Sequence, residues 1–443
     1  MRIREDRPDG IKIVVVGAGL AGLSAALSTK LANPAHEVVV YEAAKELQEI
    51  GYPRQAGLQI TPNATKLLKR WSVFDELRPL AMEPKTLTVH RYDGTAVLAR
   101  EPDLQGKVGE LYGSPFWDLH RVDLQRALSS RCRSLGIPIV LSSRVARVSF
   151  DDATVELEGG AVTRADVVVC AEGLWSSTRS RFLGRASEPA PTGDMAYRIS
   201  IDTTAMEGPH RDEILEFART GGVNVWAGPH SHAVSYSVRE GRVLNVGLLR
   251  PDDLPAETVK TTASAREVAD LLSDWDPLLR RILTEVGEVQ KWKLLWVEAL
   301  PDWTSASGTF YMVGDSCHPM LPYLAQGANS ALEDGAVLGT LLAKVVPARK
   351  DAQLRRVSEM YQALRRDRGA EIQRESFGQR TDFHLPDGEA QKARDARMVA
   401  ALERDSGPDE GFPSRWTCPR VQRFLYGYDA YAEAERAYKA DPF

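Results

Sequence analysis

Two glycine-containing segments, far apart in the chain, have residue types that could hold phosphates and sugars. The first is GAGLAG at residues 17–22, a complete G-x-G-x-x-G pattern. Gly17 lets the turn close, Gly19 lets the backbone approach a pyrophosphate, and Gly22 lets the following helix pack on the strand. Glu42, 20 residues after Gly22, ends the next expected strand, where its carboxylate can accept hydrogen bonds from a ribose. We predict dinucleotide binding, without a choice between FAD and NAD, by Gly17, Gly19, Leu20, Ala21, Gly22 and Glu42.

The second segment is VGDSCHPMLPYLAQGANSALEDG, residues 313–335. Gly314 and Asp315 would supply a tight turn and a carboxylate for sugar hydroxyls. A helix that starts near Gly327 and Ala328 would point backbone N–H groups at a phosphate or a flavin edge. A nicotinamide dehydrogenase needs one glycine-rich turn, whereas an extended FAD must also be held from its far side. The two segments together therefore favour FAD.

Histidine and tyrosine side chains in a third segment could act on a substrate. In WAGPHSHAVSYSV, residues 226–238, His232 and Tyr236 are four positions apart and would share one face of a strand, together with His230 and Val234. His232 could serve as a base or hydrogen-bond partner for a substrate hydroxyl, and Tyr236 could orient it. The alternative is that both residues only pack against the sheet.

Hydrophobic patterning predicts the elements that must position these segments. Residues 11–16 are a continuous apolar run typical of a buried parallel strand, a helix follows to about Leu31, and residues 37–41 return as a second strand, which makes a βαβ unit. Alternating residues between 195 and 249 favour an antiparallel sheet. We also expect strands at 138–141, 145–150, 165–173 and 309–313, helices at 121–135, 264–284 and 351–374, and a loop-rich stretch at 386–419.

The predicted fold class is α/β, a Rossmann-like FAD-binding domain with an inserted antiparallel-sheet substrate domain and C-terminal helices. We expect residues 1–190 to form the first part of the FAD-binding domain and 191–290 the antiparallel-sheet domain. Residues 291–345 would complete the FAD-binding domain, and 346–443 would form the C-terminal helical region.

Composition excludes several classes of protein. With 443 residues, 43% of them hydrophobic and 26% charged, the chain can bury sizeable cores. A net charge of -5 with scattered basic residues does not suggest nucleic-acid binding. The four cysteines are far apart, so neither a zinc site nor a disulfide framework is indicated. Without an apolar leader or membrane-spanning run, we expect a cytoplasmic protein with no membrane partner, either a monomer or a homodimer.

The second segment resembles the G-D motif of the class A flavoprotein aromatic hydroxylases, especially their salicylate-hydroxylase-like branch. The similarity covers most of residues 11–370. EGLWSSTR, which starts at Glu172, is similar to the family's D-G motif but carries Glu where Asp is usual, and LHRVDLQRAL matches its H-R-x-x-L helix start. The resemblance implies that the cofactor contacts also include Arg121, Glu172, Pro322 and Asn329.

The resemblance further implies an NAD(P)H-dependent flavoprotein monooxygenase. In such enzymes NAD(P)H reduces FAD, O2 forms a flavin C4a-hydroperoxide, and oxygen passes without a metal to a small aromatic or heteroaromatic substrate, here a phenolic, salicylate-like one. Arg198 stands where related oxygenases have an arginine near the substrate. Relatives typically lack Tyr52–Gln55, an apparent insertion beside the flavin. Two alternatives stay open: oxygenation of a larger secondary-metabolite phenol or indole, and a non-enzymatic GDI-like escort protein that keeps the first glycine motif for packing.

Overall fold

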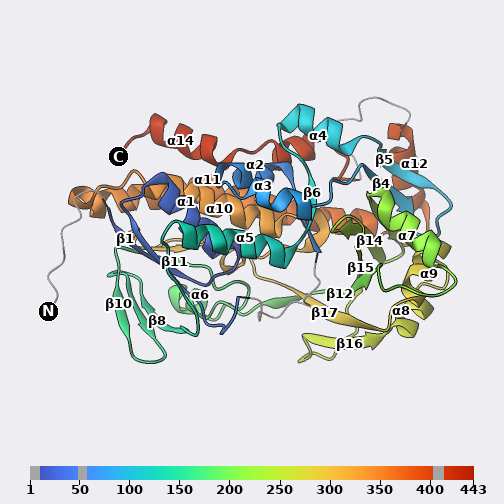
Figure 1. The fold of residues 1–443 in the computed structure, drawn as a ribbon, viewed down its shortest axis with the longest axis horizontal. Coiled ribbons are helices and arrows are strands. Elements are labelled where there is room, and N and C mark those ends of the chain that lie inside the picture. Colours follow the sequence, from blue (N-terminus) through green and yellow to red (C-terminus); the bar gives the residue numbers. More distant parts are fainter. Residues whose placement is uncertain (1–9, 48–56, 403–413) are drawn as a thin grey trace.

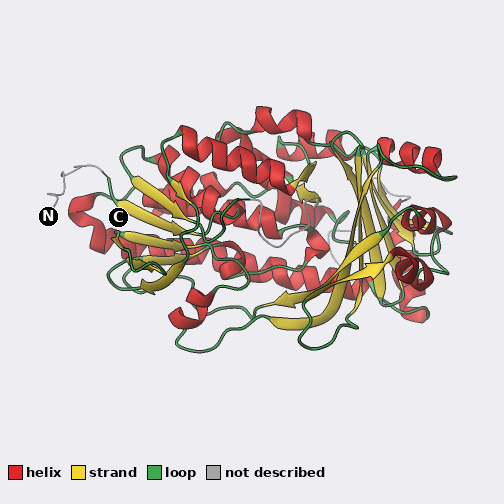
Figure 2. Cartoon of the chain, turned by 60° about the horizontal axis from the view of Figure 1, so that its bottom comes forward, coloured by secondary structure: helices red, strands yellow, loops and turns green. Residues whose placement is uncertain are grey.

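The computed structural model describes residues 10–47, 57–402 and 414–443. A parallel sheet lies at one end of the molecule and a larger mixed sheet at the other, with long helices between them (Figures 1 and 2). The apparent insertion Tyr52–Gln55 lies outside the described residues. In the described part of the chain, no helix combines the length and the apolar character that a membrane crossing requires.

The parallel sheet has the strand order β18, β11, β1, β2, β7. Its strands are β1 (Lys12–Val16), β2 (Glu37–Tyr41), β7 (Ile139–Val140), β11 (Val167–Cys170) and β18 (Phe310–Met312). Valine fills most of β1 and β11 because these strands are buried along nearly their whole length. This sheet confirms the predicted α/β class. It also brings both glycine segments to the carboxyl edge of one sheet, where α/β folds bind ligands.

Two helices of the FAD-binding part pack through small residues. Helix α1 (Leu20–Ala32) follows the first glycine turn, and α10 (Gly327–Leu342) begins where the sequence predicts a helix. Gly339 of α10 lies so close to α1 that a Cβ atom there would be 2.6 Å from Ser28 Cβ. The glycines of α10 therefore allow a close approach of α1 and α10, which fixes both glycine segments relative to each other.

The larger sheet has eight strands in the order β16, β17, β12, β15, β14, β13, β4, β5, antiparallel except where β13 pairs with β4. Its strands are β4 (Thr86–Arg91), β5 (Val97–Glu101), β12 (Ala190–Asp202), β13 (Gly222–Gly228), β14 (Ser231–Val238), β15 (Val243–Pro251), β16 (Lys260–Ser264) and β17 (Glu288–Trp296). Strands β4 and β5 therefore join the sheet from outside 191–290. The division of the chain into four parts stays a prediction.

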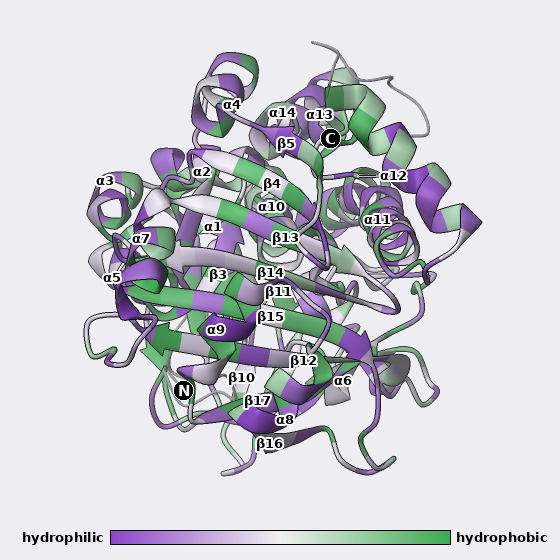
Figure 3. Cartoon of the chain, turned by 90° about the vertical axis from the view of Figure 1, so that its right-hand side faces the viewer, coloured by the Kyte–Doolittle hydropathy of each residue, from purple (hydrophilic) through white to green (hydrophobic). Residues whose placement is uncertain are grey.

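The two faces of this sheet have different surroundings: helices cover the outer face, and the inner face borders a cavity. Alternate residues of β12, such as Tyr197 and Ile199, pack against α7 (Arg211–Thr220), α8 (Ala265–Leu271) and α9 (Pro277–Thr284) on the outer face. Figure 3 looks at the molecule from this end. The intervening residues, among them Ala196 and Arg198, line a cavity on the inner face.

Three helix predictions need correction. The expected helix over 264–284 is two helices, because Asp276 accepts the N–H of Leu278 and caps a new helix whose first residue is Pro277. Helix α11 (Lys350–Phe383) runs nine residues beyond the predicted end at Arg374. The stretch 386–419, predicted as loop-rich, contains α12 (Glu389–Leu402).

Shorter elements complete the fold. The remaining strands are β3 (Gly57–Ile60), β6 (Trp117–His120), β8 (Val145–Ser149), β9 (Thr154–Leu157) and β10 (Val162–Arg164). The remaining helices are α2 (Pro62–Arg70), α3 (Phe74–Leu77), α4 (Leu104–Tyr112), α5 (Arg121–Ser134), α6 (Ser177–Phe182), α13 (Pro419–Tyr426) and α14 (Ala430–Ala440). Turns of 3-10 helix are η1 (Arg78–Leu80), η2 (Gly314–Ser316), η3 (Pro322–Leu324) and η4 (Pro347–Arg349).

Candidate cofactor and substrate site

A cavity of about 520 Å³ lies between the two glycine segments and the inner face of the larger sheet. Most residues that the sequence singled out line it, although they come from distant parts of the chain. On the cofactor side these are Gly19, Leu20, Ala21, Arg121, Asp315, Pro322, Gly327 and Ala328, and on the sheet side Arg198, His232 and Tyr236. The fold thus brings both predicted groups of residues to one space.

The first glycine turn has the geometry that a pyrophosphate requires. Gly17 has a φ of 104°, and a Cβ atom there would overlap the carbonyl oxygen of Ala171. A Cβ atom at Gly22 would overlap the carbonyl oxygen of Gly17. At Gly19, by contrast, a Cβ atom would meet nothing within 4 Å. The first and third glycines are therefore required by the fold, and the second leaves open backbone at the cavity, which fits a dinucleotide phosphate.

Glu42 holds the turn from behind. Its Oε2 accepts the N–H of Ala18 at 2.7 Å and its Oε1 accepts the N–H of Ala44 at 2.8 Å. The carboxylate is buried and, among the described residues, is not part of the cavity wall. These bonds fix the end of β2 against the glycine turn, and a contact of Glu42 with a ribose stays a prediction.

The second segment reaches the cavity through Asp315. The preceding Gly314 has a φ of 60°, and a Cβ atom there would lie 2.8 Å from Ala21 Cβ, so the two glycine segments touch. Burial raises the pKa of the Asp315 carboxyl, against the opposing effects of His318 and Arg121. A half-buried carboxyl beside Arg121 at the start of α5 fits the hydroxyls of a sugar chain.

Two predicted cofactor residues make structural contacts in the described chain. Asn329 Oδ1 accepts the N–H of Thr61 at 3.0 Å, which ties α10 to the end of β3. Glu172 accepts the hydroxyl of Ser176 at 2.6 Å and the N–H of Thr178 at 3.0 Å, so it stabilises the start of α6. Neither belongs to the described cavity wall. Their direct contact with a cofactor stays a prediction.

His232 lies in β14 with its ring held on several sides. Its Nδ1 is 2.7 Å from His384 Nε2, and its ring centroid is 5.3 Å from that of Tyr323 and 5.7 Å from that of Phe383. Burial lowers the pKa of His232 well below its ordinary value, and the nearby His384 lowers it further. His230 does not share this face, because it lies in the turn before β14 with a φ of 55° and is exposed.

Tyr236 and Arg198 complete the sheet side of the cavity. Burial raises the pKa of the Tyr236 hydroxyl, with a further rise from Asp118 and an opposing effect of Arg198. The side chains of Asn245 and Gln290 also line the cavity, and Asn245 Nδ2 and Gln290 Oε1 are buried without a hydrogen-bond partner among the described residues. Unpartnered polar atoms beside a cavity are suited to a polar ligand.

Sequence reasoning missed four of these residues. Asn245 and Gln290 are polar residues inside largely apolar strands, and that signal could have indicated them. Tyr323 lies within the second glycine segment. His384 follows α11, 152 positions after His232, and no local pattern connects the two.

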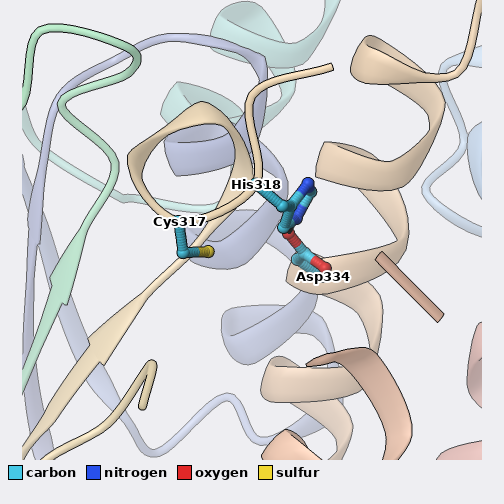
Figure 4. Close-up of side chains that lie close together, drawn as sticks. All are labelled: Cys317, His318 and Asp334. Carbon is cyan, nitrogen blue, oxygen red and sulfur yellow. Dashed lines mark hydrogen bonds and ion pairs between the residues drawn. The ribbon is translucent and has the colours of Figure 1, made fainter. Parts of the chain in front are cut away.

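One buried cluster has the side-chain types of a metal site. The ligand atoms of Cys317, His318 and Asp334 lie within 4.8 Å of one another (Figure 4). However, Asp334 already accepts the N–H of Gly314 at 2.8 Å, hydrogen-bonds to His318 Nε2, and pairs with Arg365 Nε at 2.7 Å. A guanidinium at that distance opposes a second cation, and burial raises the pKa of the Cys317 thiol, which favours its protonated form. The cluster therefore anchors the Gly314 turn as an ion-pair network.

Comparisons with known proteins identify the family of the chain. A family model described as "FAD binding domain" matches residues 10–376. The FAD-dependent monooxygenase OpS4 of Beauveria bassiana (strain ARSEF 2860) is 45% identical, over 96% of this chain and 97% of its own. The 3-amino-4-hydroxybenzoate 2-monooxygenase of Streptomyces cremeus is 30% identical, over 89% and 93% of the two chains. A solved structure described as a salicylate hydroxylase substrate complex matches with a TM-score of 0.77 at 20% identity, over 97% of this chain and 98% of that one. The fold, the two-sided cofactor site and these relatives together assign the chain to the FAD-binding monooxygenase family that includes the aromatic hydroxylases, as a flavoprotein monooxygenase that uses FAD with NAD(P)H.

Proposed function

We propose that this monooxygenase hydroxylates a small phenolic, salicylate-like aromatic substrate with NAD(P)H and O2. The observation that carries the proposal is the position of His232, a buried imidazole on the same cavity as Gly19 and Asp315. Bound FAD, reduced by NAD(P)H, supplies the activated oxygen. A phenol reacts faster with electrophilic oxygen once its hydroxyl has lost a proton, and an imidazole is suited to accept that proton.

The other polar side chains would orient the ring. The guanidinium of Arg198 can pair with a phenolate or a carboxylate, because arginine keeps its charge in a buried site. The Tyr236 hydroxyl stays protonated and can donate a hydrogen bond. Apolar residues such as Val225, Leu249 and Met320 line the same cavity and would exclude water from the reacting atoms.

The size of the cavity favours a small substrate over a larger phenol or indole. Its volume of about 520 Å³ is in the lower part of the range for ligand pockets, about 300–1,000 Å³, and the flavin must share it. The alternative of a non-enzymatic escort protein fails, because the chain belongs to a monooxygenase family.

NAD(P)H consumption by the FAD-loaded protein tests the proposal. Salicylate and 3-amino-4-hydroxybenzoate serve as small phenols, and an indole derivative enlarged by a further fused ring system serves as the contrasting larger substrate. We expect at least one phenol to stimulate NAD(P)H oxidation and to gain one oxygen atom from isotopically labelled O2, as measured by mass spectrometry. Oxygenation of the enlarged indole derivative with no product from either phenol would contradict the proposal and support the alternative substrate class.

Three further expectations belong to this proposal. They are the division into parts at residues 190, 290 and 345, a monomeric or homodimeric state, and a cytoplasmic location. Limited proteolysis, sedimentation velocity and cell fractionation would test them in turn.

A further inference from the structure

Two imidazole rings meet at the substrate end of the cavity, and the proposed function uses only one of them. His232 Nδ1 lies 2.7 Å from His384 Nε2, and the ring centroids are 5.0 Å apart. His232 is 4% exposed and lines the cavity, whereas His384 is 9% exposed and is not part of the described cavity wall. His384 thus lies behind His232 and next to the exposed turn at His230, whose N–H donates to His384 O at 3.0 Å.

The distance between the two nitrogens allows one shared proton. One nitrogen must donate and the other accept, because two imidazolium rings in contact would repel each other. Burial lowers the pKa of both rings, that of His384 to about 4. Near neutral pH both rings are therefore neutral with one proton in the bridge. When that proton sits on His232 Nδ1, His232 Nε2 has a free lone pair.

The groups around His384 leave little net charge beside it. Asp194 of β12 raises the pKa of His384, whereas Arg380 of α11 and the exposed His230 lower it. Asp194 is buried and accepts hydrogen bonds from Tyr323 Oη and Arg380, the latter through Nε and through Nη2 at 2.6 Å. The Tyr323 ring lies 6.0 Å from that of His384, centroid to centroid. The carboxylate and the guanidinium compensate each other, so the proton in the bridge is not trapped by a neighbouring charge.

We propose that His384 stands behind His232 as a proton-relay and positioning residue, and that the two rings carry the proton of a substrate hydroxyl out of the cavity. This inference rests on the proposed function. The substrate O–H bond breaks as an N–H bond forms at His232 Nε2. The proton on His232 Nδ1 passes to His384 Nε2, and His384 releases its Nδ1 proton to water. The substrate is left as an anion, both rings end neutral with their tautomers reversed, and no other reactant is consumed.

A relay solves a difficulty that burial creates for His232. A lone buried imidazole is a weak base, because a positive charge would have to remain in an apolar space. Passing the second proton on to His384 removes that charge from the cavity wall. His384 therefore determines whether His232 presents a lone pair or a hydrogen to the substrate.

The first test is independent of any substrate. In the FAD-loaded enzyme with isotopically labelled histidine, we expect a nitrogen-bound proton resonance, shifted downfield by the bridge, that correlates with His232 Nδ1 and His384 Nε2. It should be absent from His384→Phe, should lose its correlation with a second imidazole nitrogen in His384→Gln, and should be retained in the control His230→Gln. Absence of the bridge resonance from the wild-type enzyme would overturn the proposal. If the wild type oxygenates no phenol, the proposed function fails while this measurement still decides on the pair.

The second test separates relay from simple positioning. With 3-amino-4-hydroxybenzoate or salicylate, whichever the wild type hydroxylates, His384→Phe should lose on the order of 100-fold in hydroxylation rate at neutral pH. With 3-amino-4-hydroxybenzoate the loss should shrink as pH rises, because its phenol then ionises in solution. With salicylate, whose phenol is held protonated by the adjacent carboxylate, the loss should persist at high pH. Glutamine can keep a hydrogen bond to His232 but cannot pass a proton on, so His384→Gln should fold as the wild type does and show the same pH-dependent loss. A wild-type rate and pH profile in His384→Gln would overturn the relay, and the glutamine variant still decides if His384→Phe does not fold.

Discussion

Replacement of Arg365 by methionine should destabilise the protein strongly. Arg365 is fully buried, with Nη1 2.7 Å from Glu333 Oε2 and Nε 2.7 Å from Asp334 Oδ1. Methionine retains much of the apolar stem but removes the charge, which leaves carboxylates in the core without their guanidinium. Removal of one partner from a buried ion pair typically costs about 3–5 kcal/mol.

The remaining contacts place the expected loss at the lower end of that range. Glu333 keeps Arg368, whose Nη2 lies 2.9 Å from Oε1, and Asn63 Nδ2 at 2.6 Å. Asp334 keeps only the N–H of Gly314 and the ring of His318. We therefore expect a loss of about 3 kcal/mol in the free energy of unfolding. Urea unfolding of the FAD-loaded protein, followed by tryptophan fluorescence, measures it.

Acid should reduce this difference. Burial raises the pKa of Asp334, but His318 and Arg365 outweigh it and hold the pKa below its ordinary value. In the wild type the ionised carboxylate thus contributes stability above its unfolded pKa, and that contribution is lost as pH falls through the folded pKa. Without Arg365 the folded pKa rises, so Arg365→Met should differ most from wild type near neutral pH and less near about pH 5.

The neighbouring Arg366 provides a matched control. It is largely at the surface, where its Nε lies 3.5 Å from Asp367 Oδ1 and its Nη1 donates to Pro301 O at 2.8 Å. Arg366→Met should cost less than about 1 kcal/mol. Equal unfolding free energies for the two variants, or an Arg365→Met variant within about 1 kcal/mol of wild type, would refute the network as the anchor of α10.

Three further outcomes follow from the cavity. Asp315→Ala should weaken FAD binding by about 1.5–3 kcal/mol relative to the control Asp253→Ala, because Asp253 lies outside the described cavity wall. Equilibrium dialysis measures the FAD affinity of both variants, and equal affinities would show that Asp315 does not contact the cofactor. Gly22→Ala should fail to fold with FAD because its Cβ would overlap backbone, whereas Gly19→Ala should fold and only bind FAD more weakly. Melting curves with and without FAD compare the two variants. Identical behaviour would count against a structural role for Gly22 and a phosphate-binding role for Gly19. Arg198→Ala should retain FAD and consume NAD(P)H in the presence of substrate, but it should form more H2O2 and less product. An unchanged product-to-peroxide ratio would show that Arg198 does not contact the substrate.

Local sequence signals predicted the elements that carry both glycine segments. A strand, a glycine turn and a helix follow one another directly at residues 12–32. From 310 to 342 a strand and a glycine turn lead through a short loop into a helix, so in both places the sequence alone indicates the arrangement. Each segment follows the carboxyl end of a strand in the same sheet. Because these strands are parallel, their carboxyl ends lie at one edge, and the two segments meet there. The strand period also placed His232 and Tyr236 on one face, since both line the cavity.

Non-local pairing accounts for what the sequence did not predict. Strands β4 and β5 join the larger sheet because β4 pairs in parallel with β13, from Thr86 opposite Gly222 onward. No local pattern specifies such a pairing. Glu42 has the expected residue type and position, and Glu172 stands where the resembled motif usually has Asp. Both carboxylates accept nearby backbone N–H groups, and these contacts depend on the turn geometry rather than on a local sequence pattern. A prediction of His384 would have required two things that the sequence does not show: where α11 ends, and that this end packs against β14.

Helix α11 positions both ends of the site. Arg365 pairs with Glu333 of α10. About two to three turns further along α11, the side chains of Gln373 and Ser376 donate to Pro319 O at 2.8 Å and Leu321 O at 3.1 Å in the second glycine segment. Arg380 pairs with Asp194 of the larger sheet, and the helix ends at the ring that contacts His232. From Arg365 to Arg380 the helix rises roughly 22 Å. One helix therefore contacts both the second glycine segment and the larger sheet, the two sides of the cavity. A shift of α11 would move both sides together, although the helix itself supplies few residues to the cavity wall.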